Sequence, residues 1–206
     1  MTNMKHKPYG LYEAYIKRIQ DFICAFIAII LLSPVLLVVA ILVRTKLGSP
    51  ILFVQERPGL NGKVFKLYKF RTMLPPKDGE IDPLQDAQRL TSFGKKLRST
   101  SLDELPELFN ILKGDMSIVG PRPALWNQED LISERDKYNA NDIRPGLTGW
   151  AQINGRDELE IPEKAKLDGE YVSRESFMFD ILCIIRTVTS VFAHKGVVEG
   201  RTGAMK

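Results

Sequence analysis

The feature that most constrains this chain is an uncharged apolar run near its beginning. The run extends from Phe22 to Val43 and reads FICAFIAIILLSPVLLVVAILV. A helix of about 20 apolar residues crosses a bilayer core of about 30 Å, so the run is long enough to do so. It is too long for the apolar part of a secretory leader, and no small-residue cleavage site follows it. We therefore expect a membrane helix that is retained in the mature protein.

Two features favour a re-entrant helix over a spanning one. Ser33-Pro34 lies at the centre of the run, and proline predicts a helix break there because it leaves the carbonyl of Ile30 without its N–H partner. Proline kinks also occur in spanning helices, which stay an alternative. Basic residues mark the cytoplasmic side, and four lie near each end of the run: Lys5, Lys7, Lys17 and Arg18 before it, and Arg44, Lys46, Arg57 and Lys63 after it. We expect residues 1–46 to form an N-terminal segment with a re-entrant helix, and residues 47–206 a cytosolic catalytic domain.

The remaining chain predicts an α+β fold that is mainly helical. Ile51–Gln55 and Val64–Phe70 have the composition of strands. The turn residues Pro58-Gly59 and Asn61-Gly62 separate them, which indicates a short β-hairpin. A stretch rich in proline, aspartate and glycine from Pro75 to Gln85 predicts a loop.

Helices are expected after this loop. Ala87–Arg98 has a helical pattern with a basic end, and a second apolar periodicity ends at Gly114, a residue typical of helix ends. Ser101 and Glu104 match a capping box at the start of this second helix. Pro106 prefers the first turn, so the helix is expected to begin a residue or two after Ser101.

The segment from Phe177 to Phe192 is apolar but carries Asp180 and Arg186. Charged residues make it a poor spanning segment. We expect an interfacial amphipathic helix, and packing against the core is the alternative.

The net charge and the absence of several known motifs reduce the number of possible functions. A net charge of +4 and a pI of about 9.0 favour anionic partners such as phosphates or a membrane surface. Two cysteines and two histidines argue against a disulfide framework or a zinc site. The sequence contains no P-loop, no GxGxxG after a strand and no HExxH, so P-loop hydrolysis, dinucleotide redox chemistry and zinc proteolysis lose support.

Asp103 and Glu104 are adjacent carboxylates at a helix start. Acidic residues in a first turn often only stabilise the helix dipole. Beside a diphosphate, however, carboxylates can hold Mg²⁺ or attack phosphorus. Arg98 and Arg122 could converge there on a phosphate and offset the repulsion between anions.

Two stretches rich in glycine and proline, residues 119–123 and 144–156, carry Arg122 and Arg144. Loops of this kind expose backbone N–H groups and guanidinium groups that hold phosphate. Solvated arginines on ordinary loops are the alternative.

Several sequence motifs, taken together and in their order along the chain, resemble those of one family. They are the Ser33-Pro34 break, FVQERPGL from Phe53, KFRTM from Lys69, SLDELPELFN from Ser101, KGDMSIVGPRP from Lys113 and RPGLTGWAQINGR from Arg144. With these blocks the chain resembles the small monotopic phosphoglycosyl transferases, a bacterial sugar transferase family, from about Tyr15 to the C-terminal helix.

The resemblance implies a reaction. The enzyme would transfer a sugar-1-phosphate from a UDP-sugar to undecaprenyl phosphate, the first membrane step of glycan assembly. Asp103 would be the nucleophile that forms a phosphosugar ester and releases UMP, and Glu104 its partner in a catalytic dyad. Mg²⁺ would bridge Asp103 and the diphosphate. The protein would sit on the cytoplasmic face of the bacterial inner membrane and enter one leaflet only; no nucleic-acid partner is implied, and the oligomeric state is not readable.

The resemblance also implies binding residues. Arg98 and Arg122 would hold phosphate, with Lys69 and Arg144 as further candidates, and Asp168 matches an acidic position of the family. Larger members carry additional N-terminal membrane helices and a further soluble domain, so this chain is expected to be the catalytic unit alone.

Two rival functions stay open from the residues. One is a membrane scaffold that binds anionic lipid or nucleotide without turnover. The other is a phosphatase or pyrophosphatase that uses the same carboxylates with water as the acceptor.

Overall fold

The apolar run forms one long helix, α1 (Lys17–Leu47), which a short π-helical turn, η1 (Tyr12–Ile16), precedes. The computed structural model describes residues 10–75, 89–155 and 158–192. Among these residues, the helix from Tyr12 to Leu47 is long and apolar enough to cross a membrane. Most of its large apolar side chains, among them Phe26, Leu31 and Leu37, are exposed to the surroundings, as expected of a helix that meets lipid.

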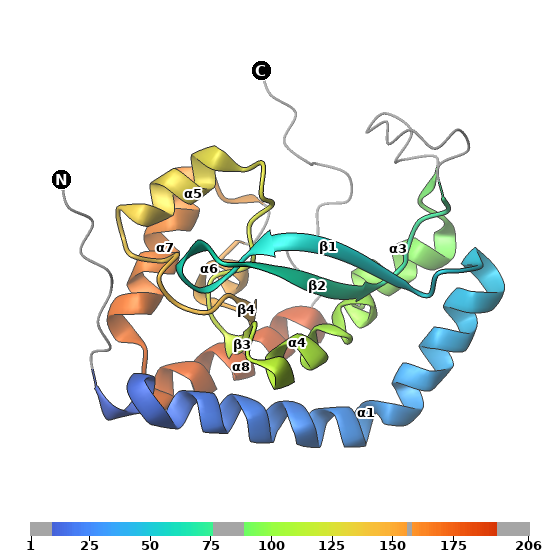
Figure 1. Cartoon of the computed structure of the whole chain (residues 1–206), viewed down its shortest axis with the longest axis horizontal. Coiled ribbons are helices and arrows are strands. Elements are labelled where there is room, and N and C mark those ends of the chain that lie inside the picture. The colour runs from blue at the N-terminus through green and yellow to red at the C-terminus, as the bar shows by residue number, and fades with distance from the viewer. Residues whose placement is uncertain (1–9, 76–88, 156–157, 193–206) are drawn as a thin grey trace.

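α1 bends in its middle, and Pro34 lies inside the helix (Figure 1). The Ser33 hydroxyl donates to the Ile30 carbonyl at 2.8 Å, so it satisfies the oxygen that Pro34 cannot. The change of direction expected at Ser33-Pro34 is therefore confirmed, whereas a break in the helix is not, because α1 continues through Pro34 without interruption. The re-entrant topology stays a prediction.

The β-hairpin is confirmed. β1 (Leu52–Pro58) pairs antiparallel with β2 (Val64–Phe70), with Leu52 opposite Phe70 and Pro58 opposite Val64. A 3₁₀ turn, η2 (Leu60–Gly62), joins them.

A second, two-stranded sheet was not predicted. β3 (Ser117–Val119) pairs in parallel with β4 (Gly146–Thr148). The two strands approach so closely that a Cβ on Gly146 would lie 2.1 Å from the backbone nitrogen of Gly120. Glycine is therefore required where the two glycine- and proline-rich stretches meet.

Short helices surround the two sheets. They are α3 (Ser92–Ser99), the 3₁₀ turn η4 (Leu102–Glu104), α4 (Glu107–Lys113), α5 (Glu129–Asp136), α6 (Trp150–Ile153), α7 (Ile161–Arg174) and α8 (Phe177–Phe192). The fold is thus mainly helical with little sheet (Figure 1). The loop expected from Pro75 to Gln85, and Ala87 of the helix expected next, lie almost entirely outside the described residues.

Both arms of α1 pack against the rest of the fold. In the N-terminal arm, Ala25 is buried with Leu108 and Ile111 of α4. In the C-terminal arm, Val43 is buried in a cluster with Leu97 of α3. The bend therefore lets one helix hold α4 and α3, the two helices on either side of η4.

α8 has two different faces. Phe179 and Cys183 are buried in a cluster with Tyr171 of α7, whereas Met178 and Ile185 are exposed. The helix thus packs on the core through one face and presents apolar side chains on the other, and its place at a membrane interface stays a prediction.

Candidate active site

Asp103 and Glu104 lie on the 3₁₀ turn η4, between α3 and α4. Ser101, which begins the turn, has a left-handed backbone (φ 54°) and makes no side-chain cap. The predicted capping box is therefore wrong. The physical reason is that the Glu104 carboxylate turns away from the helix start and pairs with two cations.

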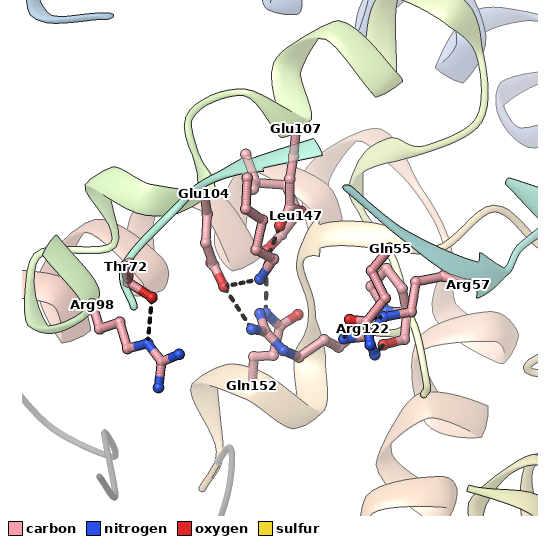
Figure 2. Close-up of polar contacts among 11 residues, drawn as sticks. Gln55, Arg57, Thr72, Arg98, Glu104, Glu107, Arg122, Leu147 and Gln152 are labelled. Atoms are coloured by element: carbon pink, nitrogen blue, oxygen red, sulfur yellow. Dashed lines mark hydrogen bonds and ion pairs between the residues drawn. The ribbon is translucent and has the colours of Figure 1, made fainter. Parts of the chain in front are cut away.

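Glu104 makes two ion pairs. Its Oε1 lies 2.8 Å from Lys69 Nζ on β2 and 2.5 Å from Arg122 Nη2 in the loop after β3; Figure 2 shows Arg122 reaching toward Glu104. Burial would raise the pKa of Glu104, but Arg122 and then Lys69 outweigh it and hold the pKa well below its usual range. Glu104 is thus a permanently charged anchor for both cations.

Glu107, the first residue of α4, is a member of this cluster that the sequence analysis missed. Its Oε1 lies 3.2 Å from Lys69 Nζ, and its side chain is 2% exposed. Burial raises the pKa of Glu107 to about 7, with Lys69 opposing and Glu104 adding to the rise. The spacing of three residues from Glu104 places both on one helical face, which is the signal that could have found it.

Asp103 differs from Glu104 and Glu107 because it makes no ion pair with the described residues. It is 8% exposed, and within the described part of the chain it forms no hydrogen bond or ion pair. Burial and the neighbouring Glu104 raise the pKa of Asp103 to about 6, while Lys69, Arg98 and Arg122 act in the opposite direction. Asp103 therefore lies in the field of three cations with its oxygens available to a ligand.

Arg98 comes from the last turn of α3. Its Nε donates to Thr72 Oγ1 at 3.1 Å, and in the view of Figure 2 it lies to one side of Glu104 with Arg122 on the other. Four of the predicted residues, Asp103, Glu104, Arg98 and Arg122, are thus brought together, and Lys69 joins them.

Two more polar residues near Arg122 were missed. Arg57 of β1 donates from Nη1 to the carbonyl of Pro123 at 3.2 Å and from Nη2 to Gln55 at 2.7 Å. Burial and the charge of Arg122 lower the pKa of Arg57 to about 10. Gln152 of α6 donates to the Leu147 carbonyl, and its Oε1 is buried without a hydrogen-bond partner.

Arg144 does not join the cluster. Its Nε donates to the carbonyl of Gly114 at 2.9 Å, just past the end of α4. Arg18 of α1 donates to the carbonyls of Ile111 and Leu112 in the last turn of the same helix. The two arginines thus satisfy the free carbonyls of a helix end, where cations are favoured.

Asp168 of α7 also lies away from Asp103. Its side chain is 2% exposed, and its Oδ2 accepts from Arg135 Nε at 2.8 Å and Nη2 at 2.6 Å. Asp168 is therefore paired through Oδ2 with a buried arginine.

The cluster also bears on the Mg²⁺ expectation. Within the described residues, no three histidine, cysteine or acidic side chains lie together as a ready-made metal site. Mg²⁺ commonly needs only one or two carboxylates, because substrate phosphates and water complete its shell. Asp103 fits this pattern, since its carboxylate makes no hydrogen bond or ion pair with the residues that the structure describes.

An exposed apolar helix lies beside a turn at which buried carboxylates and cations converge. Residues 12–194 match the bacterial sugar transferase family, and the chain belongs to this family.

Similar proteins agree with this family. The chain is 43% identical to the uncharacterized sugar transferase EpsL of Bacillus subtilis, over 89% of this chain and 91% of that one. It is 40% identical to the UDP-glucose:undecaprenyl-phosphate glucose-1-phosphate transferase of Escherichia coli, over 87% of this chain but 41% of that one. It is 36% identical to the exopolysaccharide production protein ExoY of Sinorhizobium fredii, over 87% of each. The protein is thus a transferase, and its helix α1 and these relatives indicate membrane association.

Proposed function

We propose that this enzyme transfers a sugar-1-phosphate from a UDP-sugar to undecaprenyl phosphate through a covalent intermediate on Asp103. The observation that carries the proposal is the difference in environment between two adjacent carboxylates. Glu104 is neutralised by Lys69 and Arg122, whereas Asp103 has no protein partner within the described residues and feels the same cations. Glu104 thus holds the two cations in place, and Asp103 remains available to react.

In the first step, an Asp103 oxygen attacks the phosphorus that carries the sugar. The bond from this phosphorus to the oxygen bridging the two phosphates breaks, and UMP leaves with that oxygen and its electron pair. Attack of an anion on an anionic diphosphate is opposed by repulsion, so cations near Asp103 have the largest effect on the rate. Arg98, Arg122 and Lys69 supply three.

In the second step, a phosphate oxygen of undecaprenyl phosphate attacks the same phosphorus. The phosphorus–oxygen bond to Asp103 breaks, which restores the carboxylate and yields undecaprenyl-diphosphate-sugar. Each step is a substitution at phosphorus, so no oxidant or reductant is required. The two half-reactions make the kinetics ping-pong.

Mg²⁺, held by Asp103 and the phosphates of the donor, would neutralise negative charge on the diphosphate. Arg98 can contact phosphate without giving up an ion pair among the described residues, because its side chain makes a hydrogen bond to Thr72 there. Arg122 already lies against Glu104, so it can act on a phosphate while that contact holds it in place.

The membrane geometry supports the lipid acceptor. A helix that enters and leaves one leaflet would keep α3, η4 and α4 at the membrane surface, where the phosphate of undecaprenyl phosphate lies. We propose the cytoplasmic face of the bacterial inner membrane, since basic residues flank α1 on both sides.

The test is UMP release by the detergent-solubilised protein with undecaprenyl phosphate, Mg²⁺ and a panel of UDP-sugars. Asp103→Asn should lose UMP release by at least about 10³-fold, whereas the exposed Asp130→Asn control should keep it. Near-normal release by a folded Asp103→Asn variant would overturn the assignment of the nucleophile. Free sugar phosphate in place of a lipid-linked product would favour hydrolysis, and nucleotide binding without release would favour a scaffold.

A further inference from the structure

The segment that carries Arg122 is unusual because it is proline–arginine–proline, Pro121 to Pro123. Two of its three residues have no N–H, so the backbone can be fixed there mainly through its carbonyls.

All three carbonyls of this segment accept a hydrogen bond. Gly146 N donates to Pro121 at 2.9 Å, Arg135 Nη1 donates to Arg122 at 2.9 Å, and Arg57 Nη1 donates to Pro123 at 3.2 Å. Backbone pairing with β4 supplies the first bond, and the guanidinium groups of the buried Arg135 and the half-buried Arg57 supply the other two.

Arg135 is in turn held by Asp168. Both N–H groups that Arg135 directs at Asp168 reach the same oxygen, and the two side chains are 4% and 2% exposed. A guanidinium can serve a carboxylate and a carbonyl at once because its donors form a rigid planar fork. The connection runs from α7 through α5 to the backbone of Arg122, whose side chain ends on Glu104.

We propose that Asp168 and Arg135 are positioning residues, which fix the backbone of Arg122 so that its guanidinium meets Glu104 and the donor phosphates. The inference rests on the proposed function for its effect on the rate. It also gives Asp168 a role different from substrate binding: an acid this buried, with Arg135 already bound to it, contacts no substrate.

The main test is a double-mutant cycle between Arg135→Lys and Arg122→Lys. Lysine keeps the charge at position 135 but cannot reach Asp168 and the Arg122 carbonyl together. We expect Arg135→Lys to lower kcat/KM for UMP release by about 10- to 100-fold, mainly through kcat, because a misplacement of about 1 Å costs that much. In the Arg122→Lys background, the same change should cost no more than about twofold, because it acts through Arg122. Arg174→Lys, which alters an exposed ion pair of α7, is the matched control and should stay within about twofold of the parent.

An equal loss in both backgrounds would overturn the proposal, since a general structural effect would multiply with the loss of Arg122. If Arg135→Lys does not fold, Asp168→Asn, which keeps the shape and one acceptor, carries the same cycle.

A second readout does not depend on the reaction. Hydrogen exchange at the amide of Gly120, which donates to the Thr148 carbonyl, should become faster in Asp168→Asn than in the parent and in Arg174→Lys. Unchanged exchange would sink the positioning role even if the enzyme releases UMP. Faster exchange in a protein that releases no UMP would leave the positioning role standing and remove the proposed function instead.

Discussion

Lys69 Nζ lies 2.8 Å from Glu104 Oε1 on the wall of the candidate site, and the same ammonium lies 3.2 Å from Glu107. One lysine on the hairpin thus compensates two carboxylates from two different turns. Without it, Glu104 would keep its ion pair with Arg122, and Glu107 would lose the ion pair that it makes with Lys69.

We expect Lys69→Met to reduce both stability and activity. Removing one partner of a buried pair leaves an uncompensated charge; because Lys69 is 17% exposed at its side chain, we expect a loss of about 1–3 kcal/mol in the free energy of unfolding. UMP release should fall at least about tenfold, since Asp103 loses one of its cations. Thermal unfolding in detergent and initial rates measure the two effects.

The double variant Lys69→Met with Glu107→Gln provides the control. It should regain part of the stability but little of the activity, because it removes the buried charge without restoring the cation. Full recovery of activity would show that Lys69 acts only by compensating Glu107.

Arg144→Met separates a binding role from a structural one. Its hydrogen bond to the Gly114 carbonyl predicts a loss of about 1–2 kcal/mol in stability and a KM for the UDP-sugar within about twofold of the parent. A KM that rises tenfold with unchanged stability would instead support the phosphate-binding role that the resemblance implies.

Glu175 predicts a pH dependence of stability. Burial raises the pKa of Glu175 to about 7; Lys17 opposes the rise, and Glu13, Asp180 and Asp21 add to it. Because the folded protein holds this proton more tightly than the unfolded chain, the stabilisation is fully present below the unfolded pKa of about 4.3 and is lost as the pH rises through about 7.

Glu175→Gln should therefore flatten the decline in stability between pH 5 and pH 8 by about 2 kcal/mol, measured by denaturant unfolding at fixed ionic strength. Glu163→Gln, an exposed change on α7, should leave the decline as it is. An unaltered slope in Glu175→Gln would mean that other groups cause it.

The path of α1 through the membrane can be read by labelling. Gly10→Cys and Lys63→Cys place thiols on the two sides of the helix, in a background in which Cys24 and Cys183 are replaced. A re-entrant helix predicts that neither thiol in intact spheroplasts reacts with an impermeant maleimide and that both react after lysis. Reaction of only one in intact spheroplasts would establish a spanning helix.

Local patterns in the sequence were sufficient for much of the fold. Four features each determine the backbone conformation only within a few residues of their own position. They are the apolar run, the proline at its centre, the turn residues of the hairpin and the helix end at Gly114. The same holds for Asp103 and Glu104, which share one short turn. The capping box at Ser101 is the exception. The local pattern predicted it, but the side chain of Glu104 pairs with Lys69 and Arg122 rather than with the backbone at the helix start.

Some arginines and acids lie in similar sequence motifs, and only the tertiary structure shows which of them contact the turn of Asp103 and Glu104. Arg122 and Arg144 lie in similar loops, yet the parallel pairing of β3 and β4 directs one to Glu104 and the other to the end of α4. Asp168 meets Arg135 across 33 positions of sequence. Such pairs depend on which segments pack together, since a charge is stabilised by whatever partner the burial of other residues brings within reach. The sequence alone thus determined the long apolar helix, the hairpin and the position of Asp103 and Glu104 on one short turn, and the packing of distant segments decided which charged side chains contact that turn and which support the fold.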